Sequence, residues 1–319
     1  MPLIINADDL GYSENRDIGI FEAFECNAIT AASLMVNGPT CKKAAEKAKE
    51  VGLYLSLHLN LTEGGSLTGP SSITNEKNEM YYKCDFWNLI HHSIEQYADA
   101  IKKETIAQIE KFKELTGGYP AHIDGHQHVH IFPNMPDILA PIFSKYGVKS
   151  TRVPDEDISN YEWLDAERKE RYESRFPTCL RGRLVYRSYN ILAPECFIGL
   201  ALMGEYMSRE RFFNSLTGAF GTIEWMVHPG KSVQPPKRPR SFFRDLFDQS
   251  SEREHELITL KNIEHTCPLT DWSHYDFNKC KIHLLINSLI NIDHRQGEIF
   301  PYKTIIAKIF KKPLILLSI

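Results

Sequence analysis

Four of the thirteen histidines in the chain lie close together, within residues 122–130. The same segment contains Asp124, and imidazole together with carboxylate is a ligand set that suits divalent metal ions. In an extended segment alternate side chains share one face, so His126, His128 and His130 would lie together. The pattern predicts a metal site without selecting the ligand. A structural cluster of hydrogen-bonding histidines is the alternative.

Two adjacent carboxylates, Asp8 and Asp9, follow a short apolar run near the N-terminus. Neighbouring carboxylates repel each other unless a cation or a base separates their roles. The simpler interpretation is a turn or a helix N-cap that leads into the segment beginning at Ser13. The pair by itself is compatible with both.

Three single polar residues have an ordinary structural explanation when each is taken alone. His58 would be a core histidine, His228 would belong to a turn, and Arg152 would form a surface ion pair. Like Asp8 and Asp124, however, each falls at or just beyond the C-terminal end of a predicted strand. Strand ends of one parallel sheet share a rim, so the positions together predict one site.

Predicted strands alternate with predicted helices along most of the chain. The strands are expected near residues 3–5, 29–36, 53–61, 122–124, 148–153 and 222–228. The helices are expected near residues 13–28, 42–51, 94–115, 135–145, 209–216 and 252–260. This alternation favours an α/β fold with a parallel sheet, open or closed into a barrel. Residues 155–185 are highly charged, which predicts a surface insertion.

The composition is that of an ordinary globular protein, with 319 residues, 42% of them hydrophobic, and a net charge of -4. The slightly acidic balance gives no support for a nucleic-acid partner. Seven cysteines without a C-x-x-C pair favour a reduced intracellular protein. The apolar runs are too short to cross a bilayer, so we expect no membrane association and a cytoplasmic location.

Seven motifs of the chain occur in the order found in one known family. They are Asn6-Ala7-Asp8-Asp9-Leu10-Gly11, Val36-Asn37-Gly38, Leu57-His58-Leu59-Asn60-Leu61-Thr62, residues 122–130, Thr151-Arg152, Val227-His228-Pro229 and Ser251-Glu252-Arg253-Glu254-His255-Glu256-Leu257. This set resembles the YdjC-type carbohydrate deacetylases, which include the chitooligosaccharide deacetylases. The resemblance reaches about residue 260 and implies a distorted (β/α) barrel related to polysaccharide deacetylases.

The resemblance also implies roles for individual residues. Asp9, His58 and His126 match the metal ligands of the family, and the ion is usually Mg²⁺, with Zn²⁺ or another divalent cation as the alternative. Asp8 matches the catalytic base and His228 the general acid, and Arg152 is expected to assist catalysis. The supporting or substrate-binding positions are Asp124, His128 and Asn37.

The implied activity is hydrolysis of N-acetyl groups on acetylated sugars or oligosaccharides, with release of acetate. The alternatives are a catalytically impaired sugar-binding protein and a metal-dependent hydrolase of another amide or of a phosphoester. Family members are often dimeric, so the resemblance is compatible with a homodimer, but the sequence itself shows no interface signal. The family pattern fades after Lys261, which predicts a deacetylase domain over 1–261 and a divergent C-terminal tail over 262–319. We expect this tail to lie outside the active site, although its apolar stretches could cover an open sheet edge.

Overall fold

The structure is a computed structural model that describes residues 1–232, 250–263 and 268–275. These residues belong to one structural unit, Met1–Tyr275. Most of the predicted tail, residues 264–267 and 276–319, lies outside the described residues. The expected domain boundary after Lys261 therefore stays a prediction.

The centre of this unit is a parallel sheet in which the described residues form seven strands. In chain order they are β1 (Leu3–Leu10), β2 (Ala31–Leu34), β3 (Tyr54–Leu59), β4 (His122–Gly125), β5 (Ser150–Thr151), β6 (Cys196–Ile198) and β7 (Ile223–Val227). Their order across the sheet is β5-β4-β3-β2-β1-β7-β6, and every neighbouring pair is parallel. All C-terminal strand ends therefore meet at one rim.

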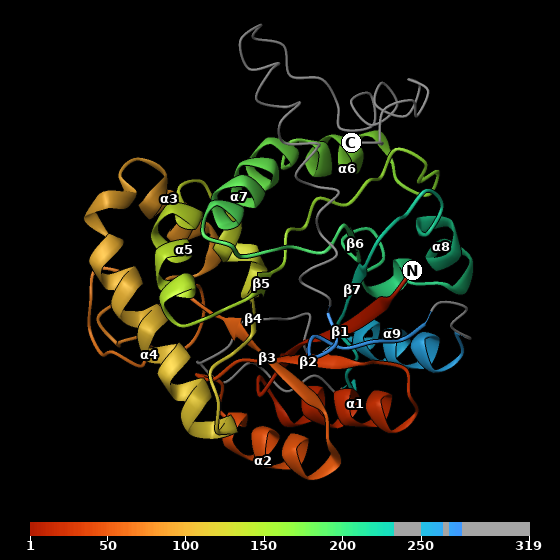
Figure 1. The fold of residues 1–319 in the computed structure, drawn as a ribbon, viewed down its shortest axis with the longest axis horizontal. Helices are drawn as coiled ribbons and strands as arrows, with labels where there is room; N and C mark the ends of the chain where they lie inside the picture. The colour runs from red at the N-terminus through yellow and green to blue at the C-terminus, as the bar shows by residue number, and fades with distance from the viewer. Residues whose placement is uncertain (233–249, 264–267, 276–319) are drawn as a thin grey trace, which may run out of the picture. The chain divides into compact units, whose positions relative to one another are not determined.

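Helices surround the strands as an outer layer (Figure 1). They are α1 (Glu14–Glu25), α2 (Cys41–Val51), α3 (Lys83–His91), α4 (Ala98–Thr116), α5 (Met135–Lys145), α6 (Ala166–Glu173), α7 (Phe176–Ser188), α8 (Arg209–Ser215) and α9 (Ser251–Lys261). Three short 3-10 segments join them: η1 (Ile94–Gln96), η2 (His126–Ile131) and η3 (Gly204–Tyr206). The arrangement confirms the expected (β/α) barrel fold.

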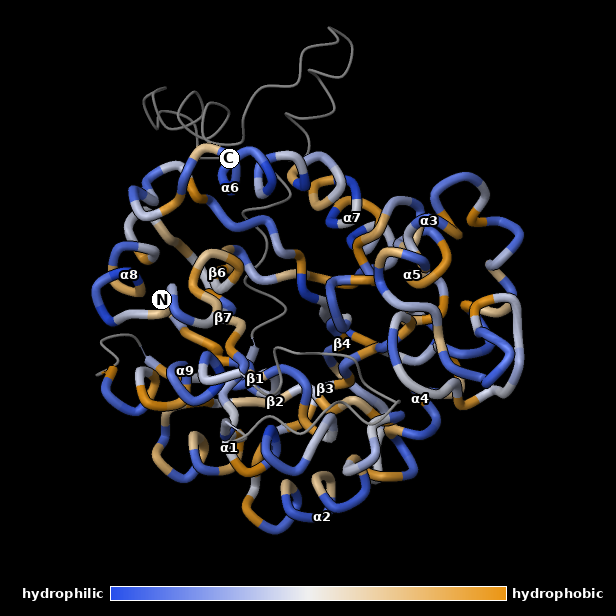
Figure 2. The backbone as a smooth tube through the Cα atoms, turned by 180° about the vertical axis from the view of Figure 1, so that it is seen from behind, coloured by the Kyte–Doolittle hydropathy of each residue, from blue (hydrophilic) through white to orange (hydrophobic). Residues whose placement is uncertain are grey.

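Local signals explain several of these boundaries. The Ser13 side chain accepts a hydrogen bond from the Arg16 backbone and caps α1. Gly52 and Gly117 end α2 and α4 in the left-handed conformation that glycine adopts without a steric cost. The helices carry hydrophilic and hydrophobic stretches in alternation, as Figure 2 shows, because only one side of each faces the sheet.

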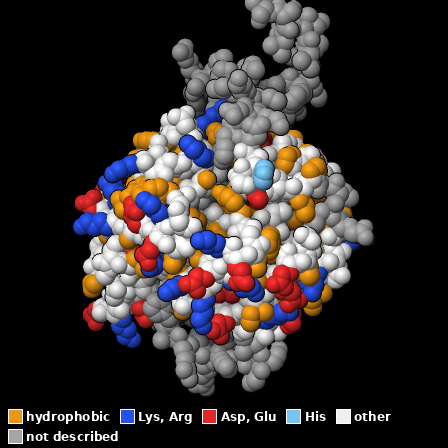
Figure 3. Space-filling model, turned by 60° about the horizontal axis from the view of Figure 1, so that its bottom comes forward, with side chains coloured by type: hydrophobic (Ala, Val, Ile, Leu, Met, Phe, Trp, Pro, Cys, Tyr) orange, Lys and Arg blue, Asp and Glu red, His pale blue; other side chains and the backbone are white. Residues whose placement is uncertain are grey.

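The two faces of the sheet differ in chemistry. One face packs under the helices and contributes apolar side chains to the main core, among them Leu3, Ile5, Ala7, Leu57, Ile123 and Trp225. Side chains alternate along a strand, so the residues between them point to the opposite, inner face. Most of the strand residues on this inner face are buried and polar, namely Asn6, Asp8, Ser33, Ser56, His58, His122, Asp124 and Glu224. The sheet therefore encloses a polar interior. On the face of the molecule drawn in Figure 3, the surface carries interspersed acidic and basic side chains.

The structure corrects three sequence-based expectations. Residues 155–185 are not only a surface insertion, because α7 buries Cys179 and Tyr186 and belongs to the helical layer. Strand β6 and helix α3 were not predicted, since their short segments carry no clear period. The strand at 122–124 does not continue as an extended segment through the histidines. It ends at Gly125, and η2 follows with left-handed backbone at Gln127 (φ 54°) and His128 (φ 60°).

Residues 268–275 pack against the barrel. The Leu3 backbone donates a hydrogen bond to the Pro268 carbonyl (2.9 Å), and Thr270 donates one to the Leu3 carbonyl (3.0 Å). The side chains of Trp272 and Tyr275 are buried. Part of the predicted tail thus lies beside the first residues of β1.

Candidate active site

The predicted site residues come from five different strand ends. Asp8 and Asp9 lie near the end of β1, His58 lies on β3, and Asp124 lies on β4. His126 begins η2 directly after β4, Arg152 follows β5, and His228 follows β7. Because these strands are parallel neighbours, residues more than two hundred positions apart meet at one rim, as the sequence pattern predicts.

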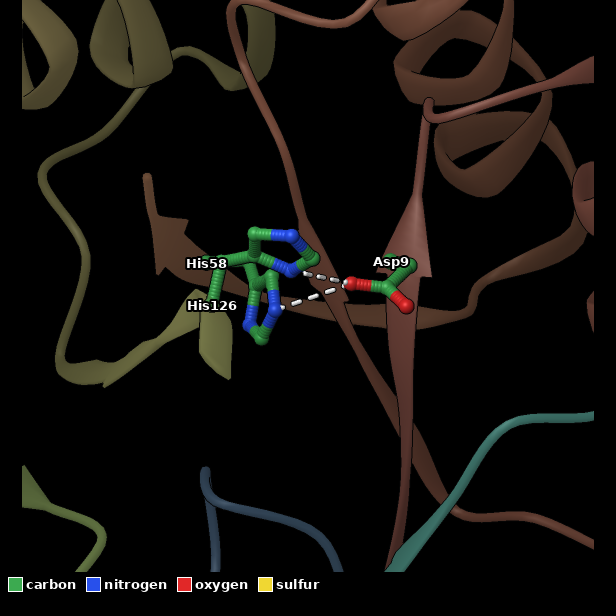
Figure 4. Close-up of side chains that lie close together, drawn as sticks. All are labelled: Asp9, His58 and His126. Atoms are coloured by element: carbon green, nitrogen blue, oxygen red, sulfur yellow. Dashed lines mark hydrogen bonds and ion pairs between the residues drawn. The ribbon is translucent and has the colours of Figure 1, made fainter. Parts of the chain in front are cut away.

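Three of these residues form a candidate metal-binding group. Asp9 Oδ1 lies 3.0 Å from His58 Nε2 and 2.9 Å from His126 Nδ1. Figure 4 shows both imidazole rings directed at this one carboxylate oxygen. All three side chains are buried. One carboxylate oxygen and two imidazole nitrogens aimed at a common point are a ligand set that suits a divalent cation.

Asp9 reaches this position through an irregularity in β1. Strict alternation would place Asp9 on the same face as Ala7, away from the polar interior. The register between β1 and β2 shifts between Ala7 and Leu10, and Asp9 has a left-handed backbone with φ 68°. An extra residue of this kind is a β-bulge, which redirects a side chain. The bulge lets both adjacent carboxylates, Asp8 and Asp9, face the site, and Ser13 rather than Asp9 caps α1.

The second oxygen of Asp9 is held by an arginine that the sequence did not single out. Arg16 Nη1 on α1 lies 2.7 Å from Asp9 Oδ2, and the Arg16 side chain is fully buried. Burial alone would raise the pKa of Asp9, but His126, Arg16 and His58 together hold this pKa well below its usual range. Asp9 is therefore ionised at neutral pH, as a metal ligand has to be.

Each candidate ligand histidine is bound through its other nitrogen by a carboxylate. Asp124 Oδ1 lies 2.7 Å from His58 Nδ1, and Glu63 Oε2 lies 2.7 Å from His126 Nε2. Burial alone would lower the pKa of both histidines, but these carboxylates and Asp9 raise the pKa of His58 to about 10 and that of His126 to about 9. Such partners fix the ring orientation and the tautomer of a ligating histidine.

Glu63 was missed by sequence reasoning because it lies in the loop after β3. Two asparagines hold this loop in place. Asn60 Nδ2 donates to the Glu63 carbonyl (2.7 Å), and Asn37 Nδ2 donates to the carbonyls of Glu63 (3.3 Å) and Gly65 (3.1 Å). The structure thus places Asn37, predicted as a supporting residue, behind the loop that carries Glu63. The signal in the sequence that could have identified Glu63 is its position, five residues after His58.

Asp8 faces an arginine rather than the ligand nitrogens. Arg152 Nη1 lies 2.5 Å from Asp8 Oδ2, and Nη2 lies 2.7 Å from Asp8 Oδ1. The same guanidinium contacts Asp124 Oδ2 (2.9 Å) and Glu224 Oε1 (2.6 Å). Burial would lower the pKa of Arg152, but the three carboxylates raise it well above its usual value. A permanent buried cation therefore holds the Asp8 carboxyl group in a fixed orientation.

Two other groups of described residues could in principle hold an ion, namely Asp8 with His58 and Asp124, and His122 with Asp124 and Glu224. Both groups contain two carboxylates that the Arg152 guanidinium already binds. A second cation would be repelled there. Burial raises the pKa of Glu224 to about 7 although Arg152 opposes this shift. The group around Asp9 therefore fits a metal ion best.

His228 lies on the other side of Asp8. Its Nε2 is 3.8 Å from Asp8 Oδ2, and its backbone N–H donates to Glu256 Oε2 on α9 (2.6 Å). Its Nδ1 has no hydrogen-bond partner among the described residues. Burial lowers the pKa of His228 to about 4 although Asp8 opposes this effect. His228 is thus a neutral imidazole at neutral pH, with one nitrogen directed toward Asp8.

The remaining histidines of residues 122–130 do not join the group around Asp9. His122 Nδ1 lies 2.7 Å from Ser150 Oγ, and His130 Nε2 bonds the Arg152 carbonyl (2.9 Å). His128 lies against the Phe197 ring, with 6.3 Å between ring centroids. The left-handed backbone at Gln127 and His128 breaks the extended alternation, so only His126 turns toward Asp9.

A family model described as YdjC-like protein matches residues 2–265. The chain belongs to this family. It is 33% identical over 273 residues to the carbohydrate deacetylase of Mus musculus, which covers 81% of this chain and 87% of the mouse protein. It is also 33% identical over 166 residues to the chitooligosaccharide deacetylase of Escherichia fergusonii, covering 52% of this chain and 64% of that protein.

Among solved structures, the YdjC-like chain is similar to a candidate cellobiose-phosphate cleavage protein from Enterococcus faecalis V583. The TM-score is 0.58 at 20% identity, covering 85% of this chain and 97% of that one. This match concerns the fold alone. Among the described residues of the YdjC-like chain, none of the helices has both the length and the apolar character needed to cross a membrane.

Proposed function

We propose that this chain is a metal-dependent carbohydrate deacetylase that hydrolyses N-acetyl groups of acetylated sugars or oligosaccharides and releases acetate. The observation that carries the proposal is the group of Asp9, His58 and His126 beside Asp8 and His228 at one rim. The carbohydrate deacetylase named among the relatives of the family supports the substrate class. Homodimer formation and a cytoplasmic location stay predictions.

The residues around Asp9 fit a divalent ion. Three protein ligands leave coordination positions for water and for the acetyl oxygen. A bound cation would polarise the acetyl carbonyl and lower the pKa of a coordinated water. We propose Mg²⁺ as the ion, and Zn²⁺ is the alternative because two of the three ligands are imidazoles.

The residues of the chain itself would move the protons. Asp8, oriented by Arg152, accepts a proton from the attacking water as the new bond to the acetyl carbon forms. His228 delivers a proton to the amine nitrogen as the carbon–nitrogen bond breaks. Because His228 is neutral before the reaction, it has to gain that proton during turnover. Asp8 Oδ2, 3.8 Å from His228 Nε2, is placed to supply it.

The experiment is an acetate-release assay on protein stripped of metal with a chelator and then reloaded with Mg²⁺, Zn²⁺ or Mn²⁺. We expect acetate from N-acetylglucosamine oligomers only after reloading, and acetate release at least about 100-fold slower from Asp8→Asn under the same conditions. Metal-dependent binding of the oligomers without acetate release would instead favour a sugar-binding protein. Release of phosphate from sugar phosphates without acetate release would favour a phosphoesterase.

A further inference from the structure

Residues 268–275 place a large aromatic side chain inside the barrel. The segment pairs with Leu3 at the first end of β1, and at its other end Tyr275 Oη donates to the Ala193 carbonyl (3.2 Å). Between these two contacts, Trp272 is 1% exposed. Its ring stacks on His122 with 3.4 Å between centroids and an interplanar angle of 11°. Trp272 thus packs against residues of the polar inner face of the sheet.

Among the described residues, the Trp272 side chain forms one polar contact, which is with Asn6. Trp272 Nε1 donates to Asn6 Oδ1 at 3.2 Å. On its other side, the Asn6 amide donates from Nδ2 to Asp8 Oδ1 (2.9 Å) and lies 3.3 Å from Asp124 Oδ2. Asn6 Nδ2 is also 3.1 Å from Ser33 Oγ. One amide therefore connects the buried indole with two carboxylates of the candidate site.

The chemistry of these partners determines which way the amide points. An indole N–H can only donate a hydrogen bond, and an ionised carboxylate can only accept one. The indole therefore requires the amide oxygen on its side, and the carboxylates require the amide nitrogen on theirs. A rotated amide would direct its oxygen at two carboxylates and its nitrogen at a donor, so all of these hydrogen bonds would be lost together.

We propose that Trp272 is a positioning residue for the reaction, acting through Asn6 on Asp8 and on Asp124, which binds the ligand histidine His58. The proposal rests on the proposed function, which makes Asp8 the base. It concerns a residue beyond the 2–265 match to the family model. It also modifies the expectation that residues after Lys261 lie outside the active site, because Trp272 touches no reacting group but fixes one that does.

The first test is Trp272→Phe, which keeps an aromatic ring against His122 and removes the N–H donor. We expect kcat to fall about five- to tenfold, the scale of one hydrogen bond, with KM and bound metal unchanged. The matched control is Tyr275→Phe, which removes the hydrogen bond to Ala193 in the same segment. It should change kcat less than about twofold. Equal kcat in Trp272→Phe and the wild type would overturn the proposal.

A double-mutant cycle with Asn6→Ala distinguishes positioning through Asn6 from a purely structural role of Trp272. If Trp272 acts through Asn6, Trp272→Phe should cause no further loss of kcat in the Asn6→Ala background. Additive losses would contradict the proposal. Should Trp272→Phe fail to fold, benzothienylalanine at position 272 keeps the two-ring shape and replaces the N–H by sulphur, and the same loss of kcat is expected.

A second readout is independent of activity. The Trp272 indole proton can be assigned by NMR from its absence in Trp272→Phe, and we expect slow exchange with solvent and a shifted resonance in Asn6→Ala. An unchanged resonance in Asn6→Ala would overturn the contact itself. If the wild-type protein releases no acetate but the Trp272 resonance is shifted in Asn6→Ala, the proposed function is refuted and the link between Trp272 and Asn6 stays intact.

Discussion

Glu63 Oε2 lies 2.7 Å from His126 Nε2, on the side of the ring opposite to the nitrogen that faces Asp9. Asp124 stands in the same relation to His58, also at 2.7 Å. The two candidate ligand histidines are therefore supported in the same way, by carboxylates from two different segments. Because the two carboxylates have equivalent positions, we expect the loss of Glu63 to weaken metal binding.

Glu63→Gln should weaken metal binding about 10- to 100-fold, the usual effect of removing a carboxylate partner from a ligating histidine. The amide can still accept a hydrogen bond but no longer carries the charge that supports His126. Competition with a fluorescent chelator measures the Kd of the ion. Glu79→Gln is the control, because Glu79 follows in the same loop and contacts Asn75 rather than the site. Unchanged affinity in Glu63→Gln would contradict the assigned role.

Replacing Asp9, His58 or His126 by Ala should remove bound metal and acetate release together. Each side chain supplies one of the three converging atoms, so two remaining ligands leave an incomplete site. Elemental analysis of the purified variants measures the metal. His128→Ala is the control and should retain the ion, because His128 faces Phe197 instead. Full occupancy in His126→Ala would show that the ligand set is different.

Asp8→Asn should keep the metal and lower kcat by about 10²- to 10⁴-fold, the scale of general acid–base catalysis. The amide preserves the shape of the carboxylate but cannot accept the proton of the attacking water. Combined metal analysis and acetate kinetics on the same preparation separate the two effects. Loss of metal in Asp8→Asn with retention in Asp9→Asn would mean that the two carboxylates have exchanged roles.

Glu156 should make stability depend on pH. Its side chain is partly buried, and the carboxyl accepts hydrogen bonds from the backbone of Gly199 (3.1 Å) and Ala201 (3.0 Å). Burial raises its pKa from 4.5 to about 7 although these bonds oppose the shift. The folded protein therefore holds this proton more tightly than the unfolded chain. The stabilisation is fully present below pH 4.5 and is lost as pH rises to about 7.

The shift of Glu156 corresponds to about 3 kcal/mol of unfolding free energy between these pH values. Glu156→Gln should abolish this contribution, so the difference in unfolding free energy between the variant and the wild type should change across the window. Urea unfolding at pH 5 and pH 8 measures it, and comparing the two proteins cancels the other titrating groups. A difference independent of pH would show that Glu156 is already ionised in the fold at pH 5.

The local pattern of apolar and polar residues was sufficient to predict many of the strands and helices. Apolar segments of strand length, each followed by a polar residue and a helical period, predict a parallel sheet with its chemistry at one rim. Helix α5 was predicted with the bounds that the structure has, Met135–Lys145. Strand β6 was missed because three residues are too few to show a period. Helix α7 was taken for an insertion because its buried residues are sparse among charged ones.

The sequence by itself determined the candidate residues, because their types and their positions after strands follow from the order of amino acids. Tertiary structure decided which of them act together. The bulge at Asp9 turns a second carboxylate inward, and the kink after His126 turns His128 away. Glu63 meets His126 across 63 positions, and Trp272 meets Asn6 across 266. Contacts over such separations depend on how the strands and loops close in space, and no local period encodes them.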